Sequence, residues 1–353
     1  MIDVIRAGVL TTVQDLGRHG YRHLGIAMGG AQDRLSLEVG NRLVGNRPDA
    51  AGLEITFGPV VLRFPRATRI AITGADFSAT LDGKPVYPWW SLPVQAGQAL
   101  SLQVAKHGMR GYVSIAGGID VLPMLGSRST DLAAGFGGLG GRALRDGDRL
   151  PVGVPSARNG SGFEPDAPGF GVKAPAWCKF ALADEPLRRG RHLAGQALAV
   201  AVRVLRGPEY DSFTADAQHA VWSDEWRVTP NSNRMGYRLS GSELKRTRNA
   251  DLLSHAVLPG TIQVPPNGQP IVLMSDAQTT GGYPRIGAVI RADLWKLAQA
   301  KLNGSVRFVE TTPDDARRAL LDERTYLRQI DAAIAMHEER YLRRTASAAL
   351  QEL

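Results

Sequence analysis

The hydrophobic and polar positions along this chain predict mainly β-structure. Alternation of polar and apolar residues from Gly260 to Val264 indicates a half-buried strand, and the apolar run Ile271 to Met274 indicates a buried one. Asp82-Gly83 and Asn267-Gly268 are typical of tight hairpins, because both residues of such turns accept positive φ angles. Further strands are expected at Ile2 to Arg6, Arg69 to Thr73, Phe77 to Leu81, Leu100 to Val104, Gly111 to Ala116, Leu198 to Leu205 and Ser305 to Glu310.

Helical periodicity is confined to a few segments. Leu35, Val39 and Leu43 fall on one helical face that follows Asp33, a residue type suited to an N-cap. Arg291 to Leu302 is amphipathic and is expected to form a single helix. Thr312 before Pro313, with acidic residues next, is a typical helix start, so one or two long helices are expected from there to Leu353.

These patterns divide the chain into four parts. Residues 1–152 are predicted to form a first β-barrel half, 153–178 a linker rich in Pro and Gly, 179–311 a second β-barrel half, and 312–353 a C-terminal helical extension. Each half contains a strand that leads into a glycine pair, Gly117-Gly118 and Gly281-Gly282. This recurrence is consistent with a duplicated β-barrel unit.

Composition narrows the class of protein. The 353 residues are long enough for two domains, and 40 Gly with 21 Pro favour frequent turns over long helices. A lone cysteine, Cys178, excludes an internal disulfide and suits a reducing compartment. The first residues lack the apolar core of a signal peptide, and no segment has the apolar length of a membrane span. We therefore expect a cytoplasmic protein.

The net charge of +8 raises the question of nucleic-acid binding. However, the 42 Lys and Arg residues are scattered among 34 acidic residues, without a basic stripe that carries stacking aromatics. Anionic small molecules or an acidic partner surface are the more economical inference.

The main candidate site follows the apolar run that ends at Met274. Ser275 to Arg285 places hydroxyl, carboxylate, amide and guanidinium groups in a glycine-rich loop at a strand end, where a rigid scaffold can hold a site. The candidate residues are Asp276, Gln278, Thr279 and Arg285. The alternative interpretation is a polar connection that caps the strand.

Three further stretches carry candidate chemistry. The first, Thr11 to Gly20, contains Asp15. His19 lies in the same stretch and is four residues from His23, but the glycines between and around them disfavour a regular metal-binding helix. No metal centre is therefore expected. Pro230 to Leu239 contains Asn231, Asn233 and Arg234, with an Asx-type turn as the alternative.

The last of these stretches is a glycine-dense run. Arg128 precedes the glycines of residues 135–141, which could offer backbone N–H groups to a phosphate but lack the spacing of a P-loop or a Rossmann turn. Asp131 is the alternative partner of Arg128.

Four stretches, taken together, resemble a known family. They are TTVQDLGRHGYRHLGIAMGGAQD, LGSRSTDLAAGFGGLGGRALRDGD, PNSNRMGYRL and LLSHAVLPGTIQVPPNGQPIVLMSDAQTTGGYPRIGAV, in family order between Val4 and Glu310. The chain resembles the biotin-dependent carboxyltransferase family, which includes KipA, allophanate hydrolase subunit 2, the 5-oxoprolinase C subunit and part of urea carboxylase. The resemblance implies a mainly β fold with two cyclophilin-like β-barrel halves.

The resemblance also implies a function. Free-standing chains of this kind are expected to work with two partners, one KipI-like and one LamB/YcsF-like, as an ATP-dependent 5-oxoprolinase that converts 5-oxo-L-proline to L-glutamate. ATP with Mg²⁺ would be shared with the KipI-like partner.

Residue chemistry then assigns roles to the candidates. Arg234, Arg285 and Arg128 would neutralise phosphate, and Asp276 would bind Mg²⁺ or act as a base. The residues expected to orient the lactam or the nucleotide are Asn231, Asn233, Gln278, Thr279 and Asp15.

Two alternative functions stay open. The first is carboxyl transfer from carboxybiotin to urea or another amide; the chain has no biotinyl Met-Lys motif, so a biotin carrier would act in trans. The second is a non-enzymatic, KipA-like regulator that binds a KipI-like kinase inhibitor.

Overall fold

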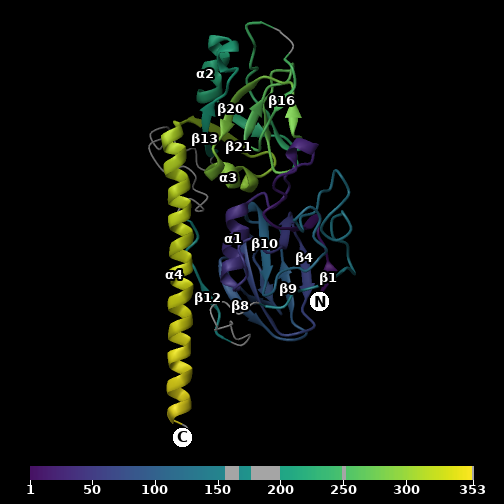
Figure 1. Cartoon of the computed structure of the whole chain (residues 1–353), viewed down its shortest axis with the longest axis vertical. Coiled ribbons are helices and arrows are strands. Elements are labelled where there is room, and N and C mark those ends of the chain that lie inside the picture. Colours follow the sequence, from purple (N-terminus) through teal and green to yellow (C-terminus); the bar gives the residue numbers. More distant parts are fainter. Residues whose placement is uncertain (156–166, 176–198, 249–251, 352–353) are drawn as a thin grey trace. The chain divides into compact units, whose positions relative to one another are not determined.

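The chain divides into two units in a computed structural model that describes residues 1–155, 167–175, 199–248 and 252–351 (Figure 1). Unit 1 comprises Met1–Leu16, Arg34–Ala174 and Glu323–Leu353, and unit 2 comprises Gly17–Asp33 and Pro175–Asp322. Gly17–Asp33 thus belongs to unit 2 although unit 1 flanks it in sequence. Residues 156–166 and 176–178 of the expected linker, and the expected start of the second half at residue 179, lie outside the described residues.

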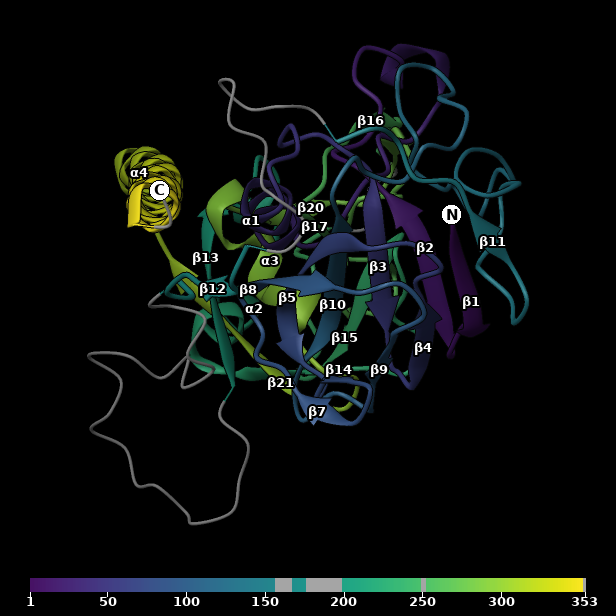
Figure 2. The ribbon, with the colours of Figure 1, turned by 90° about the horizontal axis from the view of Figure 1, so that it is seen from below.

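Unit 1 contains two six-stranded antiparallel sheets (Figure 2). The first has the order β11-β1-β4-β9-β6-β7, with bounds Arg149–Leu150, Ile2–Arg6, Val60–Arg63, Ala99–Leu102, Thr80–Leu81 and Lys84–Pro85. The second has the order β12-β8-β5-β10-β3-β2, with bounds Phe170–Gly171, Trp90–Val94, Thr68–Asp76, His107–Ile115, Gly52–Thr56 and Leu10–Gln14. Val4 and Leu62 of the first sheet share one buried core with Ile72 and Val113 of the second, so the sheets pack face to face.

Helix α1 (Arg34–Leu43) packs on β5 and β10 of the second sheet. The close approach depends on Gly40, because a Cβ there would lie 2.7 Å from the Ser114 Oγ. The hydroxyl of Thr73 donates to the carbonyl of Ser36 at 2.7 Å and fixes the helix on the sheet. The helix predicted from Leu35, Val39 and Leu43 is confirmed, and all three side chains are buried.

Unit 2 contains a closed seven-stranded barrel with the order β13-β20-β17-β18-β15-β14-β21. The bounds are Val200–Arg206, Arg285–Val289, Thr261–Gln263, Ile271–Leu273, Gly236–Ser240, Glu225–Val228 and Ser305–Glu310. Only the β13–β21 pair is parallel. The core includes Trp226, Tyr237, Ile262 and Phe308, each almost fully buried. The mainly β prediction is confirmed.

Unit 2 also contains short helices and a two-stranded ribbon outside the seven strands of the barrel. They are η1 (Arg22–Leu24), η4 (Tyr210–Ser212), α2 (Ala215–Ser223), the ribbon β16–β19 (His255–Ala256 with Thr280–Gly281), η5 (Arg291–Asp293) and α3 (Leu294–Gln299). Helix α4 (Pro313–Gln351), yellow in Figure 1, is one continuous helix. Its start is capped as expected, since the Thr312 Oγ1 accepts from the Asp315 N–H at 3.1 Å. None of the helices within the described ranges combines the length and the apolar character of a membrane span.

One local prediction of a turn is confirmed, and two local predictions of a strand and a helix are wrong. The Asp82-Gly83 hairpin is confirmed, with φ of 47° and 78°. The strand expected from Phe77 to Leu81 is wrong, because β5 continues through Gly74 to Asp76 and only Thr80–Leu81 pairs afterwards. The single helix expected over Arg291 to Leu302 is wrong as well: a 3-10 turn precedes α3, which ends at Gln299.

Candidate functional site

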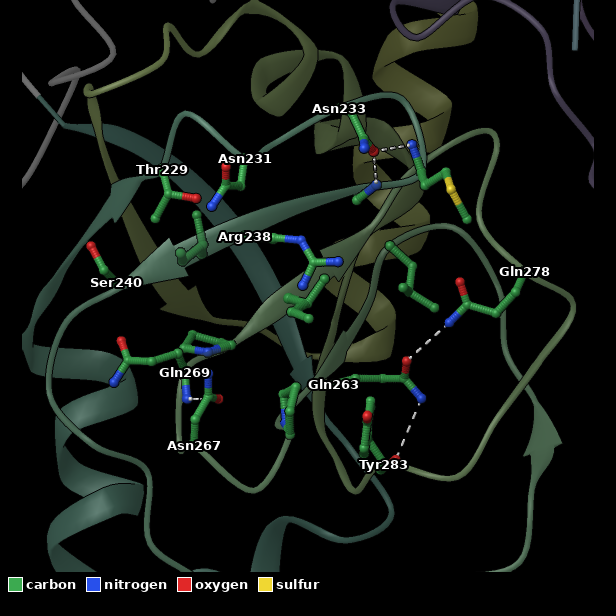
Figure 3. A pocket seen from close by; sticks show the side chains of 17 residues that line it. Thr229, Asn231, Asn233, Arg238, Ser240, Gln263, Asn267, Gln269, Gln278 and Tyr283 are labelled. Carbon is green, nitrogen blue, oxygen red and sulfur yellow. Dashed lines mark hydrogen bonds between the residues drawn. The ribbon is translucent and has the colours of Figure 1, made fainter. Parts of the chain in front are cut away.

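A cleft of about 510 Å³ opens on the barrel unit, over strands β15, β17 and β18 (Figure 3). Its apolar part offers Met235, Leu239, Pro265, Pro270, Ile271 and Leu273. Its polar part offers Thr229, Asn231, Asn233, Arg238, Ser240, Gln263, Asn267, Gln269, Gln278 and Tyr283. The cleft therefore combines an apolar wall with many neutral amides and one cation, and none of its lining residues is a carboxylate.

The β14–β15 connection shapes one side of the cleft. The Asn233 Oδ1 accepts from the Met235 N–H at 2.9 Å, and the Asn233 N–H donates to the Gly236 carbonyl at 3.1 Å. This is the Asx-type turn that was the alternative interpretation of the segment. Asn233 nevertheless lines the cleft beside Asn231, so the turn presents amides to a ligand.

Arg238 enters the cleft because of strand alternation. Tyr237 and Leu239 are buried, so Arg238 between them is exposed on the opposite face of β15. Within the described residues, the Arg238 guanidinium has no hydrogen bond or ion pair, and the same holds for the Asn231 side chain. Sequence analysis did not single out Arg238, although a charged residue between two core residues of a strand is a usable signal.

A second side of the cleft is built around Gln263 on β17, which is almost fully buried. The Gln278 Nε2 donates to the Gln263 Oε1 at 3.4 Å, and the Gln263 Nε2 lies 3.5 Å from the Tyr283 carbonyl oxygen (Figure 3). Gly281 leaves room for this amide, since a Cβ there would lie 2.5 Å from the Gln263 Nε2. Gln263 was also missed by sequence analysis.

Asp276 and Arg234 form a buried ion pair rather than an open pair of reactive groups. The Arg234 Nε and Nη2 donate to the two Asp276 carboxylate oxygens at 2.8 and 2.9 Å, and their side chains are only 5% and 4% exposed. The Arg234 Nη2 also donates to the Gly30 carbonyl at 2.6 Å. Neither residue lines the cleft, and their predicted catalytic roles stay a prediction.

Arg285 is likewise held by a carboxylate. Its guanidinium donates to Glu209 through Nε at 2.9 Å and Nη2 at 2.6 Å. This pairing lowers the pKa of the Glu209 carboxyl and raises the pKa of Arg285. Arg285 is absent from the cleft lining, as is Thr279, whose carbonyl accepts from the Val257 N–H at 3.0 Å.

Arg128 and Asp15 lie together in unit 1. The Asp15 carboxylate accepts from the Ser127 Oγ at 2.7 Å, the Ser129 Oγ at 2.5 Å and the Arg128 N–H at 2.6 Å. The Arg128 guanidinium donates to Asp120 at 2.9 Å and not to Asp131, so the expected alternative partner was wrong. Among the described residues, no group of three His, Cys, Asp or Glu side chains is placed to hold a metal ion.

The chain is similar in sequence to known proteins. Residues 24–310 match the family model described as "Carboxyltransferase domain, subdomain A and B". The chain is 47% identical to the 5-oxoprolinase C subunit of Escherichia coli (strain K12), over 96% of this chain and all of that one. It is 38% identical to the 5-oxoprolinase C subunit of Haemophilus influenzae, over 94% of this chain and 97% of that one.

A solved structure of a related protein supports the same family assignment. The crystal structure of the K. lactis urea amidolyase matches with a TM-score of 0.78 and 29% identity, covering 93% of this chain and 20% of that one. The chain therefore belongs to the carboxyltransferase domain family, subdomains A and B. The predicted family is confirmed.

Proposed function

We propose that this chain is the C subunit of an ATP-dependent 5-oxoprolinase and that its cleft binds the lactam substrate. The proposal rests on one observation: the Arg238 guanidinium, which has no partner in the part of the chain that the structure describes, lines a partly apolar cleft together with neutral amides. The two bacterial 5-oxoprolinase C subunits, which match over nearly the full chain, support the same reaction.

The substrate's chemistry matches the cleft group by group. 5-Oxo-L-proline carries a carboxylate, a secondary amide and an apolar ring. Arg238 binds the carboxylate with charge-assisted hydrogen bonds. Asn231 and Gln278 offer amide donors and acceptors to the lactam N–H and carbonyl, and Ile271 with Leu273 contacts the ring methylenes.

The reaction that this binding serves proceeds through an activated lactam. The lactam oxygen attacks the γ-phosphorus of ATP and releases ADP, which makes the ring carbon electrophilic. Water adds to that carbon and the C–N bond breaks, giving an acyl phosphate; a second water then releases phosphate and leaves L-glutamate. The amides of the cleft hold the lactam oxygen towards the incoming phosphoryl group and orient the ring for water attack.

We assign the nucleotide to the partner proteins rather than to this cleft. Magnesium in a nucleotide site is usually held by one or two carboxylates, and the phosphates by cations, but the cleft lining has no carboxylate and one cation, Arg238. We therefore assign ATP with Mg²⁺ to the KipI-like and LamB/YcsF-like partners, and no step on this chain passes through the metal. The chain's share of the reaction is to bind and orient the lactam.

Carboxyl transfer is the second candidate, because of the family and the urea amidolyase match. The same amides would hold urea, and carboxybiotin would arrive on a separate carrier. Urea itself has no anionic group, and the carboxylate in that reaction would come from carboxybiotin. 5-Oxo-L-proline, by contrast, carries its own carboxylate for Arg238. The presence of Arg238 in the cleft lining therefore favours the lactam over urea as the substrate.

The test is reconstitution of the three proteins. Co-expressed with its KipI-like and LamB/YcsF-like partners, the chain should support formation of glutamate and ADP from 5-oxoproline and ATP, in equal amounts. Omission of this chain should abolish glutamate formation. A mixture of all three proteins without 5-oxoproline turnover, or one that carboxylates urea in the presence of a biotin carrier, would overturn the proposal.

A further inference from the structure

Arg234 and Asp276 lie close in sequence to residues that line the cleft, although they do not line it themselves. Neither lines it, yet Asn233 and Met235, on either side of Arg234, do, and Gln278 follows Asp276 by two residues. The ion pair therefore connects the loop between β14 and β15 to the loop after β18. The cleft's amides Asn231, Asn233 and Gln278 come from these same two loops.

Backbone hydrogen bonds reinforce the pair. The Asp276 N–H donates to the Arg234 carbonyl at 3.1 Å, and the Met274 N–H donates to the Met235 carbonyl at 2.9 Å. With the two side-chain contacts, the loops are joined at four points within a few residues. Such a buried network holds its members in one geometry.

A third segment closes the network. The Arg234 Nη2 donates to the Gly30 carbonyl at 2.6 Å, the Gln32 Nε2 donates to the Arg234 carbonyl at 2.9 Å, and the Gly29 N–H donates to the Ser275 carbonyl at 3.0 Å. Gly29 and Gln32 belong to Gly17–Asp33, far away in sequence. The segment therefore backs both loops of the cleft.

We infer that Arg234 and Asp276 are positioning residues, which clasp the two cleft loops to Gly17–Asp33 and set the spacing of Asn231, Asn233 and Gln278 around the lactam. This inference rests on the proposed function for its substrate. Asp276 takes no proton from the substrate or from water, and it acts through the amides that it positions. Without the clasp the amides lose their common geometry, while Arg238 on β15 keeps its place.

The experiment compares two ion pairs of the same barrel unit, each with a buried aspartate. Asp276→Asn keeps the shape but removes the charge that Arg234 needs. The matched control is Asp293→Asn, because Asp293 is fully buried and accepts from the Arg203 Nη2 and Nε at 2.7 and 2.9 Å but does not line the cleft. Gln32→Ala, which removes one bond to the Arg234 carbonyl, is the milder variant if Asp276→Asn fails to fold.

In the assembled complex, Asp276→Asn should raise the KM for 5-oxoproline at least tenfold, and Gln32→Ala should raise it two- to fivefold. The pH profile of kcat/KM should keep its shape in both variants. Asp293→Asn should lower the thermal midpoint while leaving KM within twofold of wild type. A normal KM in both Asp276→Asn and Gln32→Ala, or a missing limb in the pH profile of Asp276→Asn, would overturn the positioning role.

A substrate-free measurement separates this inference from the proposed function. Hydrogen–deuterium exchange on the full chain should speed up in residues 229–235, 274–279 and 28–32 together in Asp276→Asn or Gln32→Ala, and in none of them in Asp293→Asn. If the wild-type complex lacks 5-oxoproline turnover but this exchange pattern holds, the proposed function fails and the clasp stands. Exchange confined to residues 274–279 contradicts the clasp.

Discussion

Two regions of this chain each contain a polar residue that sequence analysis selected, Asp15 in one and Asn231 in the other, and the structure uses the two regions in opposite ways. Around Asp15, three donors fill the carboxylate: the Ser127 and Ser129 hydroxyls and the Arg128 N–H. In the barrel cleft, the Arg238 guanidinium and the Asn231 side chain have no hydrogen-bond or ion-pair partner among the described residues. The first region has its hydrogen bonds satisfied and stabilises the fold, whereas the second keeps donors for a ligand.

Asp15→Ala should give the largest effect on stability. It leaves two buried hydroxyls and one backbone N–H without their acceptor, and each such group costs roughly 1–3 kcal/mol. We expect unfolding to become easier by about 3 kcal/mol or more, measured by urea denaturation. The KM of the assembled complex for 5-oxoproline should remain within twofold of wild type; a selective rise in KM at unchanged stability would place Asp15 in the site instead.

Gly17→Ala should have an intermediate effect and should act through the clasp. Gly17 has φ of 88°, and a Cβ there would lie 2.7 and 2.8 Å from the Met28 and Gly29 carbonyl oxygens. Strain of this kind costs on the order of 1–3 kcal/mol. We expect weaker 5-oxoproline binding by the assembled complex, measured by titration, together with this loss of stability.

Gly20→Ala is the control for Gly17→Ala. Gly20 also has a positive φ, of 93°, but a Cβ there has open space around it. It should cost less stability and leave 5-oxoproline binding unchanged. Equal weakening of binding by both variants would contradict the proposed route through Met28 and Gly29.

Glu209→Gln should have the smallest effect, and it depends on pH. Arg285 holds the pKa of the Glu209 carboxyl below its ordinary value of 4.5. A carboxylate with a lowered pKa contributes stability that is present above the unfolded-state pKa and is lost as pH falls through the folded-state pKa. Because the pair is partly exposed, the variant should lose less than about 1 kcal/mol at neutral pH.

The difference from wild type should shrink as pH falls from about 4.5, the ordinary pKa of a Glu carboxyl. Urea denaturation of both proteins at neutral pH and under acid conditions measures it. A stability difference that grows in acid would contradict the assignment of Glu209 and Arg285 as a structural pair.

The sequence predicted the loops of the site better than the side chains that face the ligand. Asn231, Asn233 and Gln278 were found because turn residues cluster after strands, and all three line the cleft. Arg238 was missed because its role depends on which face of β15 points into the barrel core. The carboxylate partners of Arg234 and Arg285 were not assigned, since Asp276 and Glu209 lie 42 and 76 residues from them in sequence.

The fold shows the same division between local and long-range information. Alternation and turn chemistry located β17, β18 and the Asp82-Gly83 hairpin, which depend on neighbouring residues. The membership of Gly17–Asp33 in unit 2 depends on contacts between residues far apart in sequence, such as Gln32 with Arg234. No local pattern carries that information.

The most direct test of the cleft compares two ligands in two proteins. Binding of 5-oxoproline and of the same lactam without its carboxylate, 2-pyrrolidinone, is measured for the wild-type complex and for Arg238→Gln. A charged hydrogen bond is worth about 1.5–3 kcal/mol, so wild type should bind 5-oxoproline roughly 10- to 100-fold more tightly, and the variant should bind both ligands equally. If Arg238→Gln keeps the full preference for 5-oxoproline, the carboxylate is bound elsewhere and the assignment of the cleft is wrong.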